Sequence, residues 1–265
     1  MVDLLTAEEI RKVLSVDCPR LDCFDLIDST NSFLKREALL GAVHGSVAVS
    51  NSQSAGRGRL GRSFQSPPDR GIYLSMLLRP GLAGEALMCA TGMAAAAVSR
   101  AVRRVTGANV GIKWTNDLIL NSRKLAGILA ETVVEGEDIA LVIGVGVNVH
   151  HVREDFDGEV ADIATSLAIE GYHADRAALT AAMIEELCAL SRALGGDISG
   201  YVEEYRRACV TLGREVRLMW TEKQERATAL DIDDRFGLVV RTENGEQMTI
   251  RSGEVSVRGL YGYTE

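Results

Sequence analysis

The chain has 265 residues, of which 46% are hydrophobic and 25% are charged, and its formal net charge is -8. This composition is typical of a packed globular protein with one large domain, or with a domain of about 200 residues and a small appendage. The acidic balance argues against a general nucleic-acid-binding protein, since such proteins usually carry a basic balance.

The first part of the chain alternates short helices with strands. A capping box at Thr6–Glu9 predicts a first helix, and Cys23–Ile27 is typical of a strand. Several residues of Asp28–Asn31 can cap the next helix, which we expect to end near Gly41. A strand at Ser46–Ser50 follows.

A glycine- and arginine-rich loop separates these elements from the next strand. That strand is Ile72–Leu78, a nearly continuous apolar run typical of a buried position. Glu85–Val105 is rich in alanine and predicts a long buried helix.

The middle of the chain predicts a meander of hairpins, because obvious turn residues separate its strand-like runs. These runs are Val110–Trp114, Leu118–Leu120, Leu125–Val134 and Ile139–Val149. Two helices follow, at Asp175–Leu194 and Ile198–Cys209. The fold class we expect is therefore α+β, with a mixed β-sheet and helices packed against one of its faces.

The sequence pattern changes at Gly213. From there to the end, short alternating runs separated by turn residues predict a small all-β barrel of about 50 residues. Because its core would be small, we expect it to dock on the body of the protein. We accordingly divide the chain into residues 1–212 and 213–265.

Cysteine usage and the N-terminal sequence indicate a compartment. The five cysteines are odd in number and include no C-x-x-C pair, which argues against a disulfide framework or a zinc site and for a reducing cytoplasm. The first residues lack the pattern of a secretory signal, and no apolar run approaches the ~20 residues of a membrane span. We expect a soluble, cytoplasmic protein without a membrane partner.

The segment Gly56–Arg62, which we call the Gly/Arg loop, alternates three glycines with three arginines. Glycine lets a backbone approach a ligand closely, and arginine donates bidentately to phosphate or carboxylate oxygens. The loop therefore predicts a site for a polyphosphate or a phospho-anhydride. A flexible basic arm is the alternative.

The segments Lys113–Asp117 and Arg123–Gly127 flank a predicted hairpin turn, so their side chains return to one neighbourhood. A lysine there suits a phosphate, and an asparagine presents the paired donor and acceptor that suit a base edge. The alternative is a solvated turn. We expect four side chains to converge: Lys113, Asn116, Asp117 and Lys124.

Small residues interrupt the apolar strand at Gly144–Asn148. Two glycines in a strand indicate close approach by a backbone or a ligand. A β-bulge is the alternative explanation.

In their order, five segments resemble the motifs of biotin–protein ligases. They are Asp28–Asn31, Gln53 with Gly56–Arg62, Lys113–Asp117, Arg123–Gly127 and Gly144–Asn148. The resemblance runs from about Phe24 to Val149 and returns in the β-rich tail. It implies a catalytic domain similar to class II aminoacyl-tRNA synthetases, followed by an SH3-like barrel.

The activity that the resemblance implies is that of an ATP-dependent biotin–[acetyl-CoA-carboxylase] ligase. Such an enzyme makes biotinyl-5′-adenylate from biotin and Mg²⁺–ATP, and then transfers biotin to a lysine of a biotin carboxyl carrier protein. The resemblance is compatible with a homodimer and assigns no residue as a direct metal ligand.

The resemblance also implies roles for individual residues. Biotin-binding residues would be Ser29, Thr30, Asn31, Gln53, Arg57, Gly58, Arg59, Lys124, Gly144 and Gly146. Nucleotide-binding residues would be Arg57, Arg59, Arg62, Phe64, Lys113, Asn116 and Asn148. Catalytic residues would be Lys124, Arg57, Arg59 and Asp117. In this scheme the two glycines leave room along the biotin tail, Phe64 stacks on the ligand, Asn116 reads adenine, and Asp117 orients or deprotonates the acceptor lysine.

Two departures and two alternatives accompany this interpretation. Thr115 stands where the family usually has proline, which we expect to loosen the turn. Only 27 residues precede Asp28, too few for the operator-binding winged helix of some family members, so we expect an enzyme without a nucleic-acid partner. The alternatives are a lipoate–protein ligase and a non-enzymatic ligand-sensing regulatory module. The four histidines show no ligand spacing and are interpreted as surface or structural residues.

Overall fold

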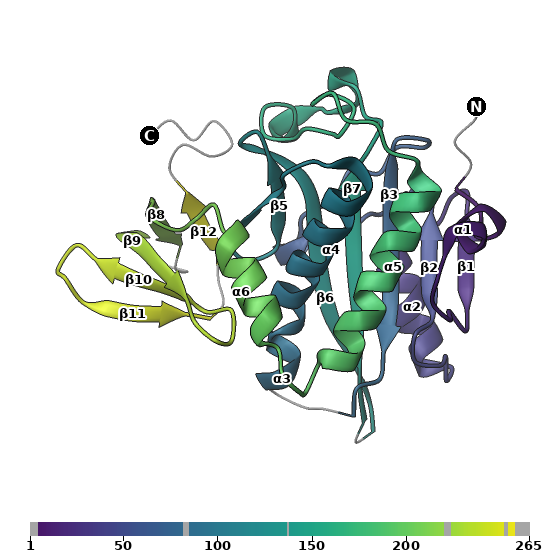
Figure 1. Ribbon diagram of the computed structural model, residues 1–265, viewed down its shortest axis with the longest axis horizontal. Helices are drawn as coiled ribbons and strands as arrows, with labels where there is room; N and C mark the ends of the chain where they lie inside the picture. The colour runs from purple at the N-terminus through teal and green to yellow at the C-terminus, as the bar shows by residue number, and fades with distance from the viewer. Residues whose placement is uncertain (1–4, 82–84, 137, 220–223, 252–253, 258–265) are drawn as a thin grey trace.

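Two β-sheets with packed helices form the molecule (Figure 1). The computed structural model describes residues 5–81, 85–136, 138–219, 224–251 and 254–257. No helix in this part of the chain is long and apolar enough to cross a membrane.

The larger sheet has seven strands in the order β1-β2-β3-β7-β6-β5-β4. Only the β1–β2 pair is parallel; the other neighbours are antiparallel. The strands are β1 (Leu21–Phe24), β2 (Val47–Ser50), β3 (Gly71–Leu78), β4 (Gly111–Lys113), β5 (Asp117–Leu120), β6 (Arg123–Glu135) and β7 (Asp138–Asn148). The expected mixed sheet with a meander of hairpins is therefore confirmed.

Helices cover both faces of this sheet. They are α1 (Ala7–Val13), α2 (Thr30–Leu39), α3 (Glu85–Met88), α4 (Ala90–Thr106), α5 (Arg176–Ala193) and α6 (Ser199–Ala208). The single helix expected over 85–105 is two helices, divided at Cys89. Short 3-10 turns lie at η1 (Arg59–Gly61), η2 (Arg153–Asp155) and η3 (Gly158–Val160).

The expectation of helices on one face is wrong for α2. Alternate residues of β3, such as Leu74 and Met76, face α4 and α5 in the main core, whereas Leu77 faces the opposite side. There it packs in a second core cluster with Leu34 and Ala38 of α2 (Figure 1). The short α2 has a mostly polar sequence, so its few apolar positions did not reveal which face it would bury.

The C-terminal region forms a second, antiparallel sheet of five strands in the order β11-β10-β9-β8-β12. The strands are β8 (Glu215–Met219), β9 (Gln224–Ile232), β10 (Leu238–Thr242), β11 (Gln247–Ile250) and β12 (Glu254–Val257). The expected all-β tail is confirmed, and β9 and β12 extend it beyond the runs that the sequence suggested.

The C-terminal sheet docks on the body through Phe236, in the turn between β9 and β10. The Phe236 ring packs edge-to-face with Tyr205 of α6, with the ring centroids 5.3 Å apart. It also lies directly over Gly92 of α4, where a Cβ would collide with the ring. The absence of a side chain at Gly92 therefore creates the notch that receives Phe236.

This notch predicts opposite effects for two helix glycines. Glycine to alanine inside a helix normally stabilises by about 1 kcal/mol. Gly92→Ala should instead lower the free energy of unfolding, because the new methyl collides with Phe236. Gly200→Ala in α6, where a Cβ meets nothing within 4 Å, is the matched control and should not destabilise. Urea denaturation followed by circular dichroism measures both, and equal stabilisation by the two would contradict the docking described.

Candidate functional site

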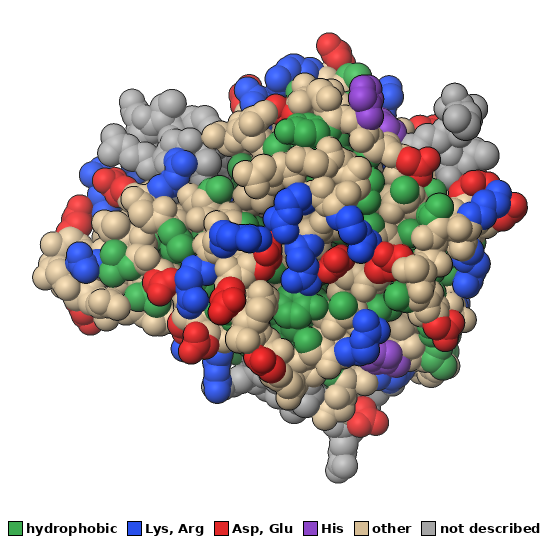
Figure 2. Space-filling view, viewed as in Figure 1, with side chains coloured by type: hydrophobic (Ala, Val, Ile, Leu, Met, Phe, Trp, Pro, Cys, Tyr) green, Lys and Arg blue, Asp and Glu red, His purple; other side chains and the backbone are tan. Residues whose placement is uncertain are grey.

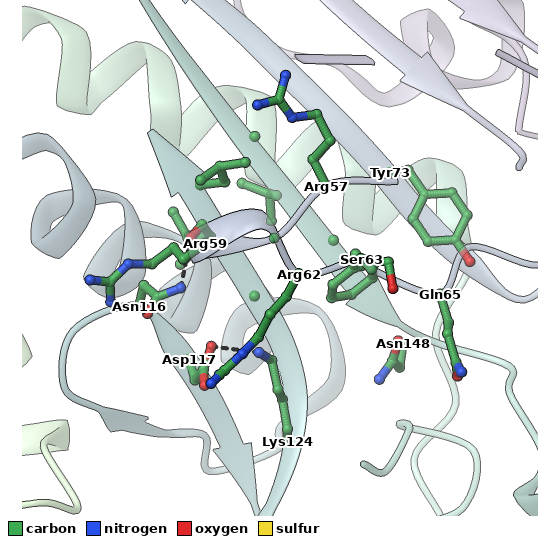
Figure 3. Close-up of a pocket in the computed structure, with 18 of the residues that line it drawn as sticks. Arg57, Arg59, Arg62, Ser63, Gln65, Tyr73, Asn116, Asp117, Lys124 and Asn148 are labelled. Carbon is green, nitrogen blue, oxygen red and sulfur yellow. Dashed lines mark hydrogen bonds and ion pairs between the residues drawn. The ribbon is translucent and has the colours of Figure 1, made fainter. Parts of the chain in front are cut away.

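A cavity of about 220 Å³ lies between the Gly/Arg loop, the β5–β6 hairpin, β7 and the segment 156–164. Every residue to which the sequence analysis gave a role lines this one cavity. Figure 3 shows several of these side chains directed toward one another. The predicted residues therefore lie together around one cavity, while the role of each stays a prediction.

The hairpin residues converge as expected. Lys124 Nζ lies 2.7 Å from Asp117 Oδ1, and Lys113 is the register partner of Asp117 across β4 and β5. The turn between β5 and β6 is tight, with Asn121 and Ser122 both in the left-handed region. A local turn thus brings two cations and a carboxylate together.

A register shift in β6 aims Lys124 into the cavity. Leu118 pairs with Ala126 but Ile119 pairs with Lys124, so Leu125 is the extra residue. Bulges of this kind redirect side chains. Here the shift allows both Lys124 and Gly127, three residues apart, to line the cavity. The bulge that the sequence analysis considered at Gly144–Asn148 is wrong, since β7 pairs there without a shift on both sides.

The Gly/Arg loop is docked and internally bonded, so the alternative of a flexible arm is wrong. Gly58 N donates to Arg62 O at 2.7 Å, and Phe64 N donates to Gly56 O at 2.9 Å. Arg59 Nη1 donates to Asn116 Oδ1 at 3.0 Å. In Figure 3 the side chain of Arg59 extends toward Asn116 and that of Arg62 toward Asp117 and Lys124, whereas Arg57 extends away from them.

Two glycines on neighbouring strands form the floor of the cavity. Gly146 of β7 is the register partner of Gly127 of β6, and the Phe64 ring covers both. A Cβ on Gly146 would lie 2.6 Å from Phe64 Cε1, and one on Gly144 would collide with Asn31. The room that the sequence analysis expected at Gly144 and Gly146 is therefore filled by protein side chains.

A buried polar network connects the start of α2 to the flanks of the loop. Gln53 Oε1 accepts from Thr30 N at 2.9 Å, and Gln53 Nε2 donates to Ser66 Oγ at 3.0 Å. Ser75 Oγ lies 2.7 Å from Thr30 Oγ1 and 2.5 Å from Asn31 Oδ1. Sequence analysis missed Ser75, although a serine inside the apolar run of β3 was a signal that a buried partner existed.

The neighbouring residue Ser29 has a local role that the structure shows directly. Its Oγ accepts from Ser32 N at 3.4 Å and so caps α2. The positive end of that helix therefore points toward the cavity, where it favours a partial negative charge.

Sequence analysis also missed the wall formed by Phe156, Val160, Ile163 and Ala164. Backbone hydrogen bonds attach it to β6: Lys124 N donates to Ile163 O at 2.7 Å, and Thr165 N donates to Lys124 O at 2.9 Å. Asn148 Nδ2 holds Thr165 O at 2.9 Å. The recurrence of apolar residues every three or four positions in an otherwise polar stretch was the available signal.

The segment around Thr115 is held from behind. Trp114 N donates to Thr211 Oγ1 at 3.0 Å, and its Nε1 donates to Phe236 O at 2.8 Å. Tyr205 Oη donates to Thr115 O at 3.0 Å. The C-terminal region and α6 therefore contact this turn from behind, while the effect of threonine in place of proline stays a prediction.

Within the described residues, no group of three or more histidine, cysteine, aspartate or glutamate side chains is arranged to hold a metal ion. Asp117 is the acidic residue of the cavity lining, and it is ion-paired with Lys124.

Comparison with known families gives two matches. Residues 23–148 match the model described as the biotin/lipoate A/B protein ligase family. Residues 211–258 match the model of the biotin protein ligase C-terminal domain.

Comparison with individual proteins agrees. The chain is 32% identical to the biotin–[acetyl-CoA-carboxylase] ligase of Mycobacterium tuberculosis, over 89% of this chain and 88% of that protein. It is 32% identical to the bifunctional ligase/repressor BirA of Bacillus spizizenii, over 83% of this chain and 69% of that protein. The structure of the Aquifex aeolicus biotin protein ligase with biotin and ATP matches at a TM-score of 0.77 and 27% identity, covering 91% of this chain and 99% of that one.

His151 is a buried residue behind the wall of the cavity. Its side chain has no exposed surface, and it stacks on Phe156 with ring centroids 5.0 Å apart. Neither ring nitrogen has a hydrogen-bond partner. Burial, the largest influence, lowers the pKa of His151 to about 4, so the ring is neutral at pH 7.

Burial of neutral His151 predicts acid sensitivity. The unfolded chain protonates this histidine near pH 6.5 but the folded chain only near pH 4, so stability falls as the pH falls through that window. His151→Phe keeps the stacking ring and should reduce the loss of unfolding free energy between pH 7 and pH 5 by about 1–2 kcal/mol. Urea unfolding at the two pH values measures this, with exposed His173→Gln as the control. The same pH dependence in His151→Phe and the unmodified chain would refute the assignment.

Proposed function

The chain belongs to the biotin protein ligase family, and we propose that it attaches biotin to a lysine of an acceptor protein in two steps through an adenylate. The observation that supports this best is the arrangement of the loop arginines and the hairpin lysine around one cavity. Such a concentration of cations in an acidic protein suits a reaction between two anions.

In the first step, a carboxylate oxygen of biotin forms a bond to the α-phosphorus of ATP, and pyrophosphate leaves. Because both reactants are anions, cations must neutralise their approach and the charge on the phosphoryl oxygens. We assign this work to Lys124, and we assign Arg57 and Arg59 to closing the loop over the adenylate that forms. Mg²⁺ enters as part of the nucleotide substrate, since it commonly binds through phosphate oxygens and retains several waters.

Biotin would occupy the end of the cavity nearest α2. The side chains of Ser29, Thr30, Asn31 and Gln53 supply donors and acceptors for its ureido ring, and their mutual hydrogen bonds orient them before the ligand arrives. The tail would run along Gly144 and Gly146 once the Phe64 ring turns off the floor and stacks on the ligand. Gly58 would let the loop backbone approach it.

The nucleotide would occupy the end nearest the hairpin. Lys113 and Arg62 would meet its phosphates, and Asn116 the adenine edge. Asn116 uses its Oδ1 for Arg59 and its Nδ2 for Ile128 O at 2.9 Å. Adenine recognition therefore requires Arg59 to exchange from Asn116 to the phosphoryl oxygens. We place Asn148 at the same end.

In the second step, the acceptor lysine attacks the biotinyl carbonyl carbon and AMP leaves. The lysine must lose a proton near neutral pH, against a reference pKa of about 10.4. Asp117, a carboxylate of the cavity lining, would orient the lysine or accept its proton. From the name of the Mycobacterium tuberculosis relative, we propose the biotin carboxyl carrier protein of acetyl-CoA carboxylase as the acceptor.

Further features of the protein complete the proposal. A cytoplasmic location fits the five free cysteines. We divide the chain into a catalytic domain over 1–212 and a C-terminal domain over 213–265. Analytical sedimentation would test whether the protein forms a homodimer.

Biotin is favoured over lipoate because the Mycobacterium tuberculosis relative and the Aquifex aeolicus structure, which each match most of the chain, are named for biotin, and so is the C-terminal model. A competition assay with the two acids discriminates between them. A ligand-sensing module would bind biotin without consuming ATP.

One experiment tests the whole proposal. The purified chain is incubated with biotin, Mg²⁺–ATP and a biotin carrier domain, and mass spectrometry is used to find a biotinylated lysine. Pyrophosphate release is followed in parallel. A chain that consumes no ATP when offered biotin does not have this function.

Lys124→Ala should lower the rate of adenylate formation about 100-fold or more, because it removes a cation that stabilises charge only as the reaction proceeds. ATP binding should change much less. Pyrophosphate release measures the first quantity and calorimetric titration the second. Lys12→Ala, in the exposed helix α1, is the control. Near-normal pyrophosphate release from Lys124→Ala would refute the assignment.

Arg59→Gly should leave adenylate synthesis nearly intact but release the intermediate about tenfold faster, because the loop loses the guanidinium that exchanges from Asn116 to the phosphoryl oxygens of the bound adenylate. Chromatography of free biotinyl-adenylate during turnover measures the release. Arg59→Gln removes the same charge without adding backbone freedom and should behave alike. If neither variant loses intermediate faster, Arg59 does not retain it.

A further inference from the structure

Glu131 is an ionised side chain beside the loop that the proposed reaction does not use. It projects from β6, next to the cavity, and its side chain is 15% exposed. Burial raises the pKa of this carboxyl, but hydrogen bonds from Asn31 and Lys35 and the charge of Arg57 lower it more, so the pKa lies below its ordinary value. An ionised carboxyl in a mostly buried position beside a cavity indicates a functional or structural role.

Three donors from two separate segments converge on Glu131. Arg57 Nη2 lies 3.1 Å and Lys35 Nζ 2.9 Å from its Oε1. Asn31 Nδ2 donates to its Oε2 at 3.0 Å. One carboxylate thus joins the Gly/Arg loop to the beginning of α2.

The α2 side of this junction is rigid. Asn31 Nδ2 also donates to Leu129 O at 3.2 Å, and its Oδ1 accepts from the buried hydroxyl of Ser75. Glu131 is therefore held from below by an amide that is itself fixed, so it provides a stationary attachment point for Arg57.

Arg57 differs from the other loop arginines in its direction. Its side chain extends away from the hairpin group of Lys124 and Asp117, while Arg62 extends toward that group and Arg59 toward Asn116 (Figure 3). The loop thus makes polar contacts with the sheet at two places, through Arg57 to Glu131 of β6 and through Arg59 to Asn116 before β5.

We propose that Glu131 is a positioning residue, which anchors the first arginine of the loop and thereby keeps the loop docked over the cavity. This inference rests on the proposed function only for its consequence, the retention of the adenylate. Glu131 touches none of the reacting groups and acts through Arg57.

The test compares Glu131→Gln with the unmodified chain. The amide keeps an oxygen that can accept from Asn31 but loses the charge that attracts Arg57. Limited trypsin digestion without ligands should cleave after Arg59 and Arg62 about fivefold faster, as expected when a half-exposed ion pair is lost. Biotinyl-adenylate should escape faster by a similar factor, while the biotin affinity measured by calorimetry stays within about twofold.

Matched variants separate positioning from general destabilisation. Glu37→Gln on α2 removes a carboxylate of similar exposure that pairs with Arg20 at 2.6 Å, and it should leave loop cleavage unchanged. Glu131→Asp keeps the charge and should restore most of the protection. Arg57→Gln should accelerate cleavage after Arg59 as much as Glu131→Gln does, and the double variant should be no faster.

The outcomes are distinguishable from failure of the proposed function. Trypsin digestion requires no catalysis, so it tests the anchor even if the chain forms no adenylate. Cleavage of Glu131→Gln at the rate of the unmodified chain would overturn the inference. Additive effects of Arg57→Gln and Glu131→Gln, or an equal acceleration in Glu37→Gln, would overturn it as well.

Discussion

The docking of the Gly/Arg loop along β6 is the interaction on which the candidate site depends. β6 pairs with both β5 and β7, so it lies inside the sheet and cannot shift by itself. It carries Lys124 and Gly127 in the lining of the cavity and, further along the strand, Glu131, which pairs with Arg57 of the loop. The face that carries α4, α5 and α6 shows Lys and Arg side chains lying among Asp and Glu side chains (Figure 2). A strand with two paired neighbours therefore gives the Gly/Arg loop a fixed surface on which to dock.

Two glycines make that docking possible. Gly127 and Gly146 remove the side chains that would otherwise stand between the loop and the sheet, and Phe64 fills the space. Under the proposed function, the ring that closes the floor is also the group that turns when a ligand enters. The absence of side chains at Gly127 and Gly146 therefore has two consequences. It lets the loop pack closely on the sheet, and it leaves space that a ligand would occupy once the Phe64 ring turns away.

How far the sequence predicted this site depends on the range of each contact. Lys124 and Asp117 are joined by a tight turn, so their convergence followed from local pattern alone. The contact of Arg57 with Glu131 joins residues far apart in sequence, so no local pattern predicts it. Only the order of the family motifs indicated that the loop and the hairpin belong to one site. The sequence analysis did not predict the placement of α2 or the wall at 156–164, for the same reason. The surface that a short, mostly polar segment packs against decides which of its residues are buried.

The charges of the site are balanced within the protein before any ligand binds. Lys124 has Asp117 at 2.7 Å, and Arg57 has Glu131 at 3.1 Å. A cluster of unpaired cations would repel itself and destabilise the fold, whereas these pairs hold each cation near its place of use. In the proposed reaction an entering phosphate or carboxylate exchanges with Asp117 at Lys124 rather than meeting an unpaired cation, whereas Arg57 keeps its pairing with Glu131. The ligand-free and ligand-bound states of Lys124 would differ only in the anion that pairs with it, so part of the binding energy is spent on replacing Asp117. In return, the side chains need little reorganisation when the reaction begins.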